Sequence, residues 1–335
     1  MGNIRKVLYV TSHETDYLQD IVYSGLVELL GTNAVLEIPF HRSYHWATKP
    51  YPKNMGQQPG SLWPNLLNRI SDFKYDAVIV ASTKPDTFQK YLHFLPRIPA
   101  KIPVAFLDGG DRPELGGDLE RLGAKELFSQ AQNIRPFDLI FKREYLETDS
   151  HPQNVLSMPF GMDLRSIPKT ISTTSHFAKK YQVSFWAVES DPIRSQALAL
   201  LEPLFDCREN GTTQKQVFRK YKRKGEFYLQ ELSHCQIVLN FRGVGWDTLR
   251  YWEVPAIGTF MISGRPQIRI PNNFIHNEEI IYCKDDLSDL EDLCRYYLKH
   301  QEKREKIAQR AQQKLQTYHS HIARAKELVA ALEKI

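Results

Sequence analysis

The sequence predicts an α/β protein built on two doubly wound parallel sheets. Three observations lead to this fold class. Short buried-strand patterns alternate with helical patterns along the chain, polar residues collect directly after the strands, and 335 residues are enough for two domains of ordinary size. A hydrophobic content of 42% and a charged content of 25% are typical of a folded globular protein and exclude a disordered one.

The first half of the chain is expected to form the first sheet. Its strand patterns are short apolar runs, most of them followed by a polar loop. The strand patterns lie at 5–10, 35–38, 77–81, 104–107 and 139–141, and the helical patterns lie at 17–30, 61–72 and 87–95. This alternation favours parallel strands with helices on both faces of the sheet.

The second half repeats the alternation after a polar linker at 167–179. The sequence predicts strands at 182–187, 236–240 and 259–262, helices at 190–204 and 226–233, and terminal helices at 287–300 and 302–333. We therefore expect a second sheet of the same kind, followed by long helices at the end of the chain.

One stretch organises this second half. The buried strand at 236–240 runs into a glycine loop at 242–245, and Asp247 or Thr248 can cap the helix that follows. The free N–H groups at the start of such a helix, together with its dipole, favour an anion placed outside the strand's carboxyl end. The stretch is therefore suited to binding a phosphate group.

The same stretch carries a family resemblance in the pattern R-G-x-G-x-D-T-x-R-x-W-E. It resembles the nucleotide-sugar half of GT-B glycosyltransferases, most closely the exostosin-type enzymes and the "glycosyl transferases group 1" domain of spore-maturation-type proteins. The matching positions are Ser233, Arg242, Gly243, Gly245, Asp247, Arg250, Glu253 and Gly258.

The resemblance implies two Rossmann-like domains that face each other across a cleft, with C-terminal helices that pack back on the first domain. The segment 156–163, L-S-M-P-F-G-M-D, resembles the interdomain passage of such proteins. The expected divisions are an acceptor domain at 1–165, a linker at 166–180, a nucleotide-sugar domain at 181–310 and a returning helix at 311–335.

The resemblance also assigns donor-binding roles. Glu253 is expected to accept hydrogen bonds from ribose hydroxyls, because a carboxylate offers acceptors to two neighbouring hydroxyl groups. Arginines supply charge-assisted contacts suited to a diphosphate, although Glu253 and Arg250 can equally form a surface ion pair. The expected donor-binding residues are Arg194, Arg242, Gly243, Gly245, Asp247, Thr248, Arg250 and Glu253.

One position departs from the family pattern. Group 1 enzymes usually carry a second glutamate eight residues before the first, where this chain has Gly245. The departure favours the exostosin-like interpretation and weakens any mechanism that needs two glutamates.

Candidate catalytic residues follow strands of the first sheet, where the resemblance places the acceptor. His13 or Asp16 can take the proton of an acceptor hydroxyl, and Asp108 follows a later strand in the same way. The alternative for each is an ordinary loop residue. Lys142 and Arg143 can balance a donor phosphate.

The predicted function is sugar transfer from a nucleoside-diphosphate sugar to a hydroxyl acceptor on a carbohydrate or a lipid-linked molecule. We expect no metal and no cofactor beyond the donor, because no metal-ligand motif occurs. The alternative is a GT-B-shaped nucleotide-binding, sugar-binding or assembly protein without transfer activity, which the missing second glutamate supports.

Charge and cysteine content restrict the expected partners and location of the protein. A net charge of +5 falls short of a nucleic-acid-binding footprint, so no nucleic-acid partner is expected. The basic run at 215–224 is typical of a solvated face, and the alternatives are a pyrophosphate-binding patch or a peripheral contact with a membrane surface. The four cysteines have no C-x-x-C pairing, which favours reduced thiols and a cytoplasmic location.

Overall fold

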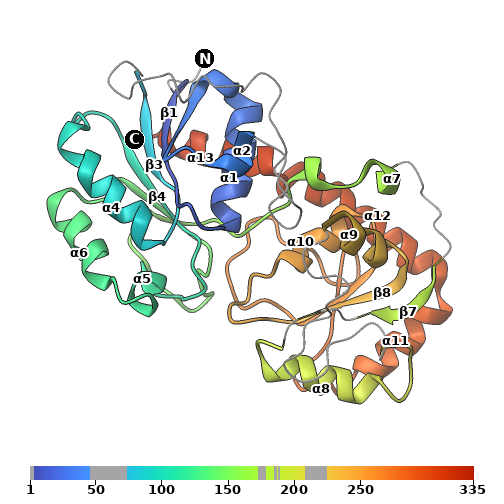
Figure 1. The fold of residues 1–335 in the computed structure, drawn as a ribbon. Coiled ribbons are helices and arrows are strands. Elements are labelled where there is room, and N and C mark those ends of the chain that lie inside the picture. Colours follow the sequence, from blue (N-terminus) through green and yellow to red (C-terminus); the bar gives the residue numbers. More distant parts are fainter. Residues whose placement is uncertain (1–3, 46–73, 173–178, 185–186, 188, 208–224) are drawn as a thin grey trace.

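The computed structural model describes residues 4–45, 74–172, 179–184, 187, 189–207 and 225–335. Within these residues the chain forms two separate parallel sheets, each covered by helices (Figure 1). The predicted α/β class with two Rossmann-like domains is confirmed. The predicted helix at 61–72 and the basic run at 215–224 lie outside the described residues.

The first sheet has six strands in the order β2-β1-β3-β4-β5-β6. Its strands are β1 (Val7–Val10), β2 (Val35–Ile38), β3 (Ala77–Val80), β4 (Val104–Asp108), β5 (Leu139–Lys142) and β6 (Val155–Ser157). The first five coincide closely with the predicted strands, because each is a run of buried apolar residues. The sixth, β6, pairs with β5 at the sheet edge and was not predicted.

The strand order of the first sheet reverses between β1 and β3. Val7 of β1 pairs with Val35 on one side and with Ala77 on the other. At such a switch point the loops after the two strands diverge, and open sheets bind ligands in the resulting crevice. The loops in question begin at Thr11 and Ala81.

Helices cover both faces of this sheet (Figure 1). They are α1 (Tyr17–Leu30), α2 (Arg42–His45), α4 (Pro85–Phe94), α5 (Gly117–Arg121) and α6 (Lys125–Ile134), with short 3₁₀ turns at Thr32–Ala34 and Leu95–Arg97. The Asp16 carboxylate caps α1 by accepting a hydrogen bond from the Gln19 N–H at 3.2 Å. The cap fixes the start of α1 beside the switch point.

The second sheet has four described strands in the order β10-β9-β8-β7. They are β7 (Tyr181–Ser184), β8 (Cys235–Asn240), β9 (Met261–Ser263) and β10 (Ile281–Tyr282). The helices of this half are α7 (Lys169–Ser172), α8 (Pro192–Leu201), α9 (Gly225–Ser233), α10 (Leu249–Ala256), α11 (Leu290–Lys299) and α12 (Gln301–Tyr318), with a 3₁₀ turn at Leu164–Ser166. The predicted strand–glycine loop–helix unit is thus β8, its loop and α10.

The chain ends in two helices where the sequence predicts one from 302 to 333. Helix α12 stops at Tyr318, and α13 (His321–Leu332) begins after Ser320, whose hydroxyl accepts a hydrogen bond from the Ala323 N–H. Helix α12 packs on α10, and α13 packs on α1 of the first domain. The return of the C terminus to the first domain is confirmed, with the crossing at residues 319–320.

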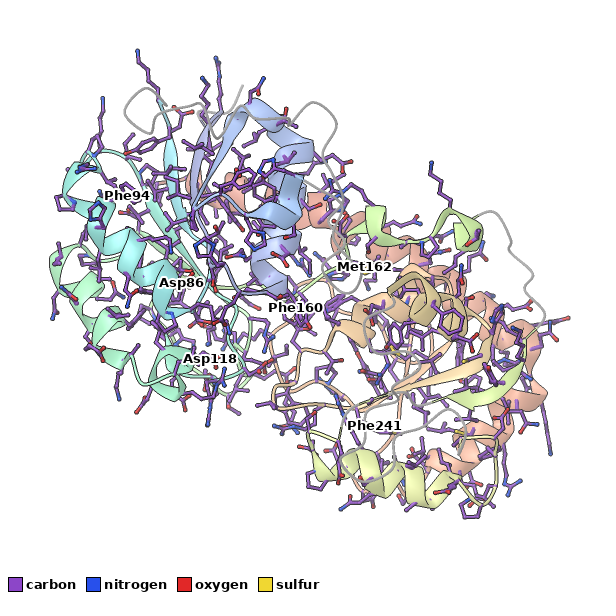
Figure 2. The ribbon with its side chains drawn as sticks, viewed as in Figure 1. Asp86, Phe94, Asp118, Phe160, Met162 and Phe241 are labelled. Carbon is purple, nitrogen blue, oxygen red and sulfur yellow. The ribbon has the colours of Figure 1, made fainter. Side chains whose placement is uncertain are left out.

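A second crossing of the chain runs through Phe160 and Met162, which lie between the two sheets (Figure 2). Both side chains belong to a hydrophobic cluster that also contains Leu18 of α1 and Trp252 of α10. The buried Arg324 guanidinium of α13 donates to the Phe160 carbonyl at 2.7 Å. Apolar burial and hydrogen bonding therefore fix the junction between the domains.

Among the described residues, no helix combines the length and apolar character that crossing a membrane requires.

Candidate functional site

The glycine loop after β8 forms a tight turn at the carboxyl edge of the second sheet. The Gly243 N–H donates to the Gly245 carbonyl at 2.9 Å, and a side chain at 243 would meet the Arg194 guanidinium and the Ser190 hydroxyl at 3.1 Å. The loop therefore needs glycine where α8 approaches it. Helix α10 begins directly after the loop, with Thr248 as its N-cap residue.

Arg194, near the start of α8, points at this loop. Its guanidinium donates to the carbonyls of Arg242 at 2.8 Å and Phe241 at 3.0 Å, and the side chain is buried. Burial and the charge of Arg250 lower the pKa of Arg194 to about 10. The two arginines are therefore close enough to interact, and an anion bound between such like charges would be stabilised.

Arg250 and Glu253 lie on the first turns of α10. The Arg250 Nε donates to the Tyr228 hydroxyl at 3.2 Å. Glu253 is 3% exposed, and burial raises its pKa to about 8. The alternative of a solvent-exposed surface ion pair is wrong, because both side chains are buried.

Arg242 takes a different position from Arg194 and Arg250. Its guanidinium lies over the Trp246 ring at 4.2 Å, and its Nε is 3.1 Å from the Asp191 carboxylate. Its side chain remains partly exposed.

A cavity of about 190 Å³ opens beside these residues at the carboxyl ends of β8 and β9. Asn240, Arg242, Trp246, Gly264 and Arg265 are among the residues that line it. The indole of Trp246 offers an apolar surface, and the arginines offer hydrogen-bond donors. This volume is below the roughly 300–1,000 Å³ of sites for drug-sized ligands, so the cavity suits one part of a larger ligand.

Asp247 and Thr248 are engaged within the protein. Asp247 is buried, and its carboxylate accepts hydrogen bonds from the Phe160 N–H at 2.6 Å and the Trp252 indole N–H at 2.7 Å. The Thr248 hydroxyl donates to the Asn240 side chain at 2.7 Å. Both contacts orient α10, and the Asp247 contact also joins it to the passage between the domains.

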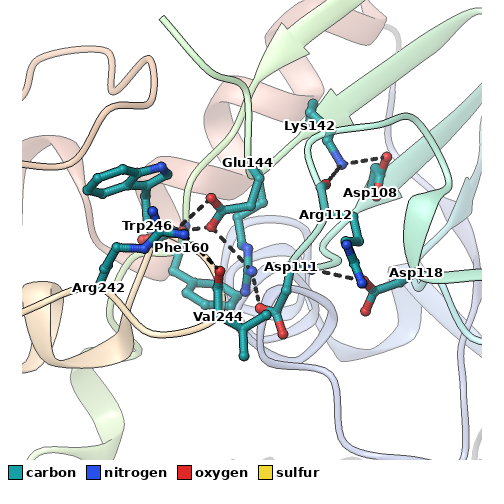
Figure 3. A network of polar contacts seen from close by, with 12 residues as sticks. Asp108, Asp111, Arg112, Asp118, Lys142, Glu144, Phe160, Arg242, Val244 and Trp246 are labelled. Carbon is teal, nitrogen blue, oxygen red and sulfur yellow. Dashed lines mark hydrogen bonds and ion pairs between the residues drawn. The ribbon is translucent and has the colours of Figure 1, made fainter. Parts of the chain in front are cut away.

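Gly245 lies against a residue of the first sheet. Glu144, which follows β5, accepts hydrogen bonds from the Trp246 and Asp247 N–H groups, both at 2.9 Å (Figure 3). A side chain at 245 would place its Cβ 2.7 Å from the Glu144 carboxyl carbon. The position that holds a second glutamate in group 1 enzymes is thus next to a glutamate supplied by the other domain.

Arg143 connects Glu144 to the rest of the junction. Its guanidinium binds the Asp111 carboxylate, lies 3.3 Å from the Glu144 carboxylate, and covers the Phe160 ring at 4.3 Å. Burial alone lowers the pKa of Arg143, but the carboxylates of Glu144, Asp247 and Asp111 raise it above its ordinary value. The guanidinium therefore stays charged between the domains.

Asp16 lies at the switch point of the first sheet. Its carboxylate accepts a hydrogen bond from the Ser82 hydroxyl at 2.7 Å in the loop after β3. Burial raises the pKa of Asp16, although Ser82, Gln19 and Arg143 oppose the shift. A raised pKa suits a proton acceptor better than an ordinary aspartate.

Tyr17, which the sequence analysis did not single out, faces the second domain. Its ring packs edge-on against Phe160 at 5.9 Å. Burial, followed by the charges of Glu253 and Asp20, raises its pKa to about 12. Tyr17 therefore brings the start of α1 within electrostatic range of α10. No local signal marked it, because the contact depends on the placement of the domains.

Of the other two candidate catalytic residues, His13 is exposed and Asp108 is buried. The His13 backbone N–H donates to the Asp86 carboxylate at 2.9 Å. Asp108 is fully buried and binds the Lys142 ammonium at 3.0 Å and the Gly116 N–H at 2.9 Å (Figure 3). The Asp108 carboxylate thus holds a lysine and a loop together, and the catalytic role of Asp108 and the phosphate-binding role of Lys142 stay predictions.

Comparisons with known proteins define the class. Residues 198–330 match the family described as "Glycosyl transferase-like". No curated protein matches the chain at a significant level. The sequence resemblance to GT-B glycosyltransferases is therefore confirmed over the second half of the chain.

Similar solved structures extend this likeness to the whole chain. They include Alr3699/HepE from Anabaena in complex with UDP-glucose, with a TM-score of 0.57, 11% identity, and coverage of 98% of this chain and 100% of that one. Sucrose-phosphate synthase from Thermosynechococcus elongatus has a TM-score of 0.59 at 10% identity, covering 98% of both chains. An alpha-glucosyltransferase bound to UDP and DNA has a TM-score of 0.60 at 14% identity, covering 99% and 100%. The chain has the GT-B fold.

Proposed function

We propose that the chain is a glycosyltransferase that moves a sugar from a nucleoside-diphosphate sugar to a hydroxyl acceptor. The observation that carries this proposal is the pair Arg194 and Arg250 beside the start of α10. Two cations and the N terminus of a helix together stabilise a diphosphate, both when it is bound and when it leaves. The glycosyl transferase-like match over 198–330 covers Arg250 and α10.

The remaining parts of the donor have places around this pair. Glu253 lies further along α10, where its carboxyl group can bind the ribose hydroxyls. The cavity beside Trp246 suits the base or the sugar. Because Glu253 is buried, the residues that cover it have to move to admit the donor.

The acceptor belongs on the first domain in this proposal. Asp16 is the proton acceptor that the geometry favours, since it lies at the switch point and near the junction. We propose a carbohydrate or a lipid-linked molecule as the acceptor. No metal and no cofactor beyond the donor take part.

A test begins with a thermal-shift screen of UDP, GDP, ADP and CDP and their common sugar conjugates. A bound ligand raises the melting temperature by mass action. Incubation with the binding sugar nucleotide then tests for donor hydrolysis. Binding without any hydrolysis or transfer supports the alternative, a GT-B-shaped binding protein without transfer activity. Absence of binding contradicts both.

A further inference from the structure

Glu144 makes a contact that neither donor binding nor acceptor chemistry explains. Glu144 follows β5 of the first domain. Its carboxylate nevertheless accepts two hydrogen bonds from consecutive backbone N–H groups of the second domain, those of Trp246 and Asp247. The side chain is 2% exposed. Burying a carboxylate is costly unless it is paired, and here two N–H donors and the Arg143 guanidinium offset the cost.

The glycine loop is built around this carboxylate. A Cβ at position 245 would come within 2.7 Å of the Glu144 Cδ and 3.1 Å of an Arg143 nitrogen. Any side chain at 245 would therefore displace Glu144. The absence of a Cβ at 245 and the presence of Glu144 together define the shape of the loop.

The loop in turn sets the position of α10. Trp246 and Asp247 immediately precede Thr248, the N-cap of α10. The helix carries Arg250 and Glu253. The start of the loop is held by Arg194, which donates to the Phe241 and Arg242 carbonyls. A shift of residues 246–247 would therefore move the proposed diphosphate site away from Arg194.

We propose that Glu144 is a positioning residue for donor binding, which holds the glycine loop in register from the first domain. This inference rests on the proposed function. The carboxylate occupies the N–H groups of Trp246 and Asp247, so the donor diphosphate binds at the N terminus of α10 and the arginine pair instead. Through Asp111, Arg143 and Glu144, the first domain then influences donor affinity without touching the donor.

The test is calorimetric titration of the protein with whichever of UDP, GDP, ADP or CDP binds it. Glu144→Ala is expected to weaken affinity at least about ten-fold, which corresponds to about 1.4 kcal/mol. Glu144→Gln keeps one acceptor oxygen and should lose less. Glu126→Gln, at an exposed glutamate of α6 in the same domain, is the control and should bind like the unchanged protein.

Position 245 supplies an independent variant. Gly245→Ala should weaken binding as Glu144→Ala does, and the double variant should bind no worse than either single one, because the clash disappears with the carboxylate. Titrations run well below each melting temperature separate positioning from lost stability. Variants with lowered melting temperatures but unchanged affinity would overturn the inference alone. If the unchanged protein binds no diphosphate, the proposed function itself fails, and the inference with it.

Discussion

The Asp247 carboxylate accepts a hydrogen bond from the Phe160 N–H at 2.6 Å and so joins the start of α10 to the passage between the domains. Its other oxygen accepts the Trp252 indole N–H at 2.7 Å. The resemblance assigned Asp247 to donor binding, and the structure gives it two structural partners instead. These contacts help to orient α10, and that helix carries Arg250 and Glu253.

Replacing Asp247 with asparagine should destabilise the protein. An asparagine has one carbonyl oxygen and one NH₂ group where Asp247 has two acceptor oxygens. The NH₂ group cannot accept a hydrogen bond from the Phe160 N–H or the Trp252 indole N–H, so one buried hydrogen bond is lost at a cost of roughly 1–3 kcal/mol. Urea unfolding measures the change. Glu302→Gln, at an exposed position of α12, serves as the control. Equal stability of the two variants would mean that the Asp247 contacts contribute little.

Gly25→Ala tests the packing of α13 on α1. A Cβ at position 25 would overlap the His321 carbonyl group and reach the Ala325 Cβ at 2.9 Å. Alanine in a helix interior is normally favoured over glycine by about 1 kcal/mol, so a net loss of roughly 1–3 kcal/mol would come from overpacking. Gly264→Ala, where the added Cβ meets only Phe241 at 3.5 Å, is the control. A more stable Gly25→Ala variant would contradict the packing.

The pH dependence of stability should report Glu253. Burial raises its pKa from 4.5 to about 8, and burial likewise raises the pKa of Asp247 to about 7. Between these folded values and the unfolded ones the folded state binds more protons, so the free energy of unfolding falls as pH rises. This contribution is complete below the unfolded pKa of 4.5 and is lost as pH rises through about 8.

Glu253→Gln removes the titrating group and should flatten this slope. The stability of the unchanged protein relative to the variant should decrease from about pH 5 to about pH 8, measured by urea unfolding at several pH values. A difference that stays constant over that range would show that Glu253 is not held neutral by burial.

Donor hydrolysis or transfer should persist in excess chelator. The positive charge that stabilises the leaving diphosphate comes from Arg194, Arg250 and the N terminus of α10 in our account. Within the described part of the chain, no group of three or more His, Cys, Asp or Glu residues could hold a metal ion. Loss of activity in EDTA that manganese or magnesium restores would refute metal independence.

Much of the donor half could be predicted because its signals are local. Strand β8 is a largely apolar run, the glycines mark the loop, and Thr248 occupies the N-cap position of the helix, although its side chain makes no cap hydrogen bond. Each of these signals depends only on residues that are neighbours in the sequence. The same locality explains why five of the six strands of the first sheet were predicted within one or two residues.

The contacts that define the junction could not be predicted in this way. Glu144 meets Trp246 across 102 residues of sequence, and the charge of Glu253 raises the pKa of Tyr17 only because two domains are placed together. Asp108 shows a second contact of this kind. Its ion pair with the buried Lys142 joins residues 34 apart in the sequence, and no local signal marked it.

The end of the chain shows a signal that was present but hidden. Ser320 caps α13, yet helical periodicity continues on both sides of it, so the sequence reads as one helix. The break matters because α12 packs on α10 of the second domain, whereas α13 packs on α1 of the first domain. The Arg324 contact with the Phe160 carbonyl, which holds that return, again joins residues far apart in sequence.

The central claim is that the α10 region binds a nucleoside diphosphate through Arg250 and Glu253. Calorimetric titration with UDP, GDP, ADP and CDP measures this most directly for the unchanged protein, Arg250→Ala and Glu253→Ala, with melting temperature as the folding control. We predict that one diphosphate binds and that each variant loses roughly 1.5–3 kcal/mol, about ten- to a hundred-fold in affinity. Arg295→Ala, on the exposed face of α11, should bind like the unchanged protein. Unchanged affinity in both Arg250→Ala and Glu253→Ala would contradict the site, even with the GT-B fold in place.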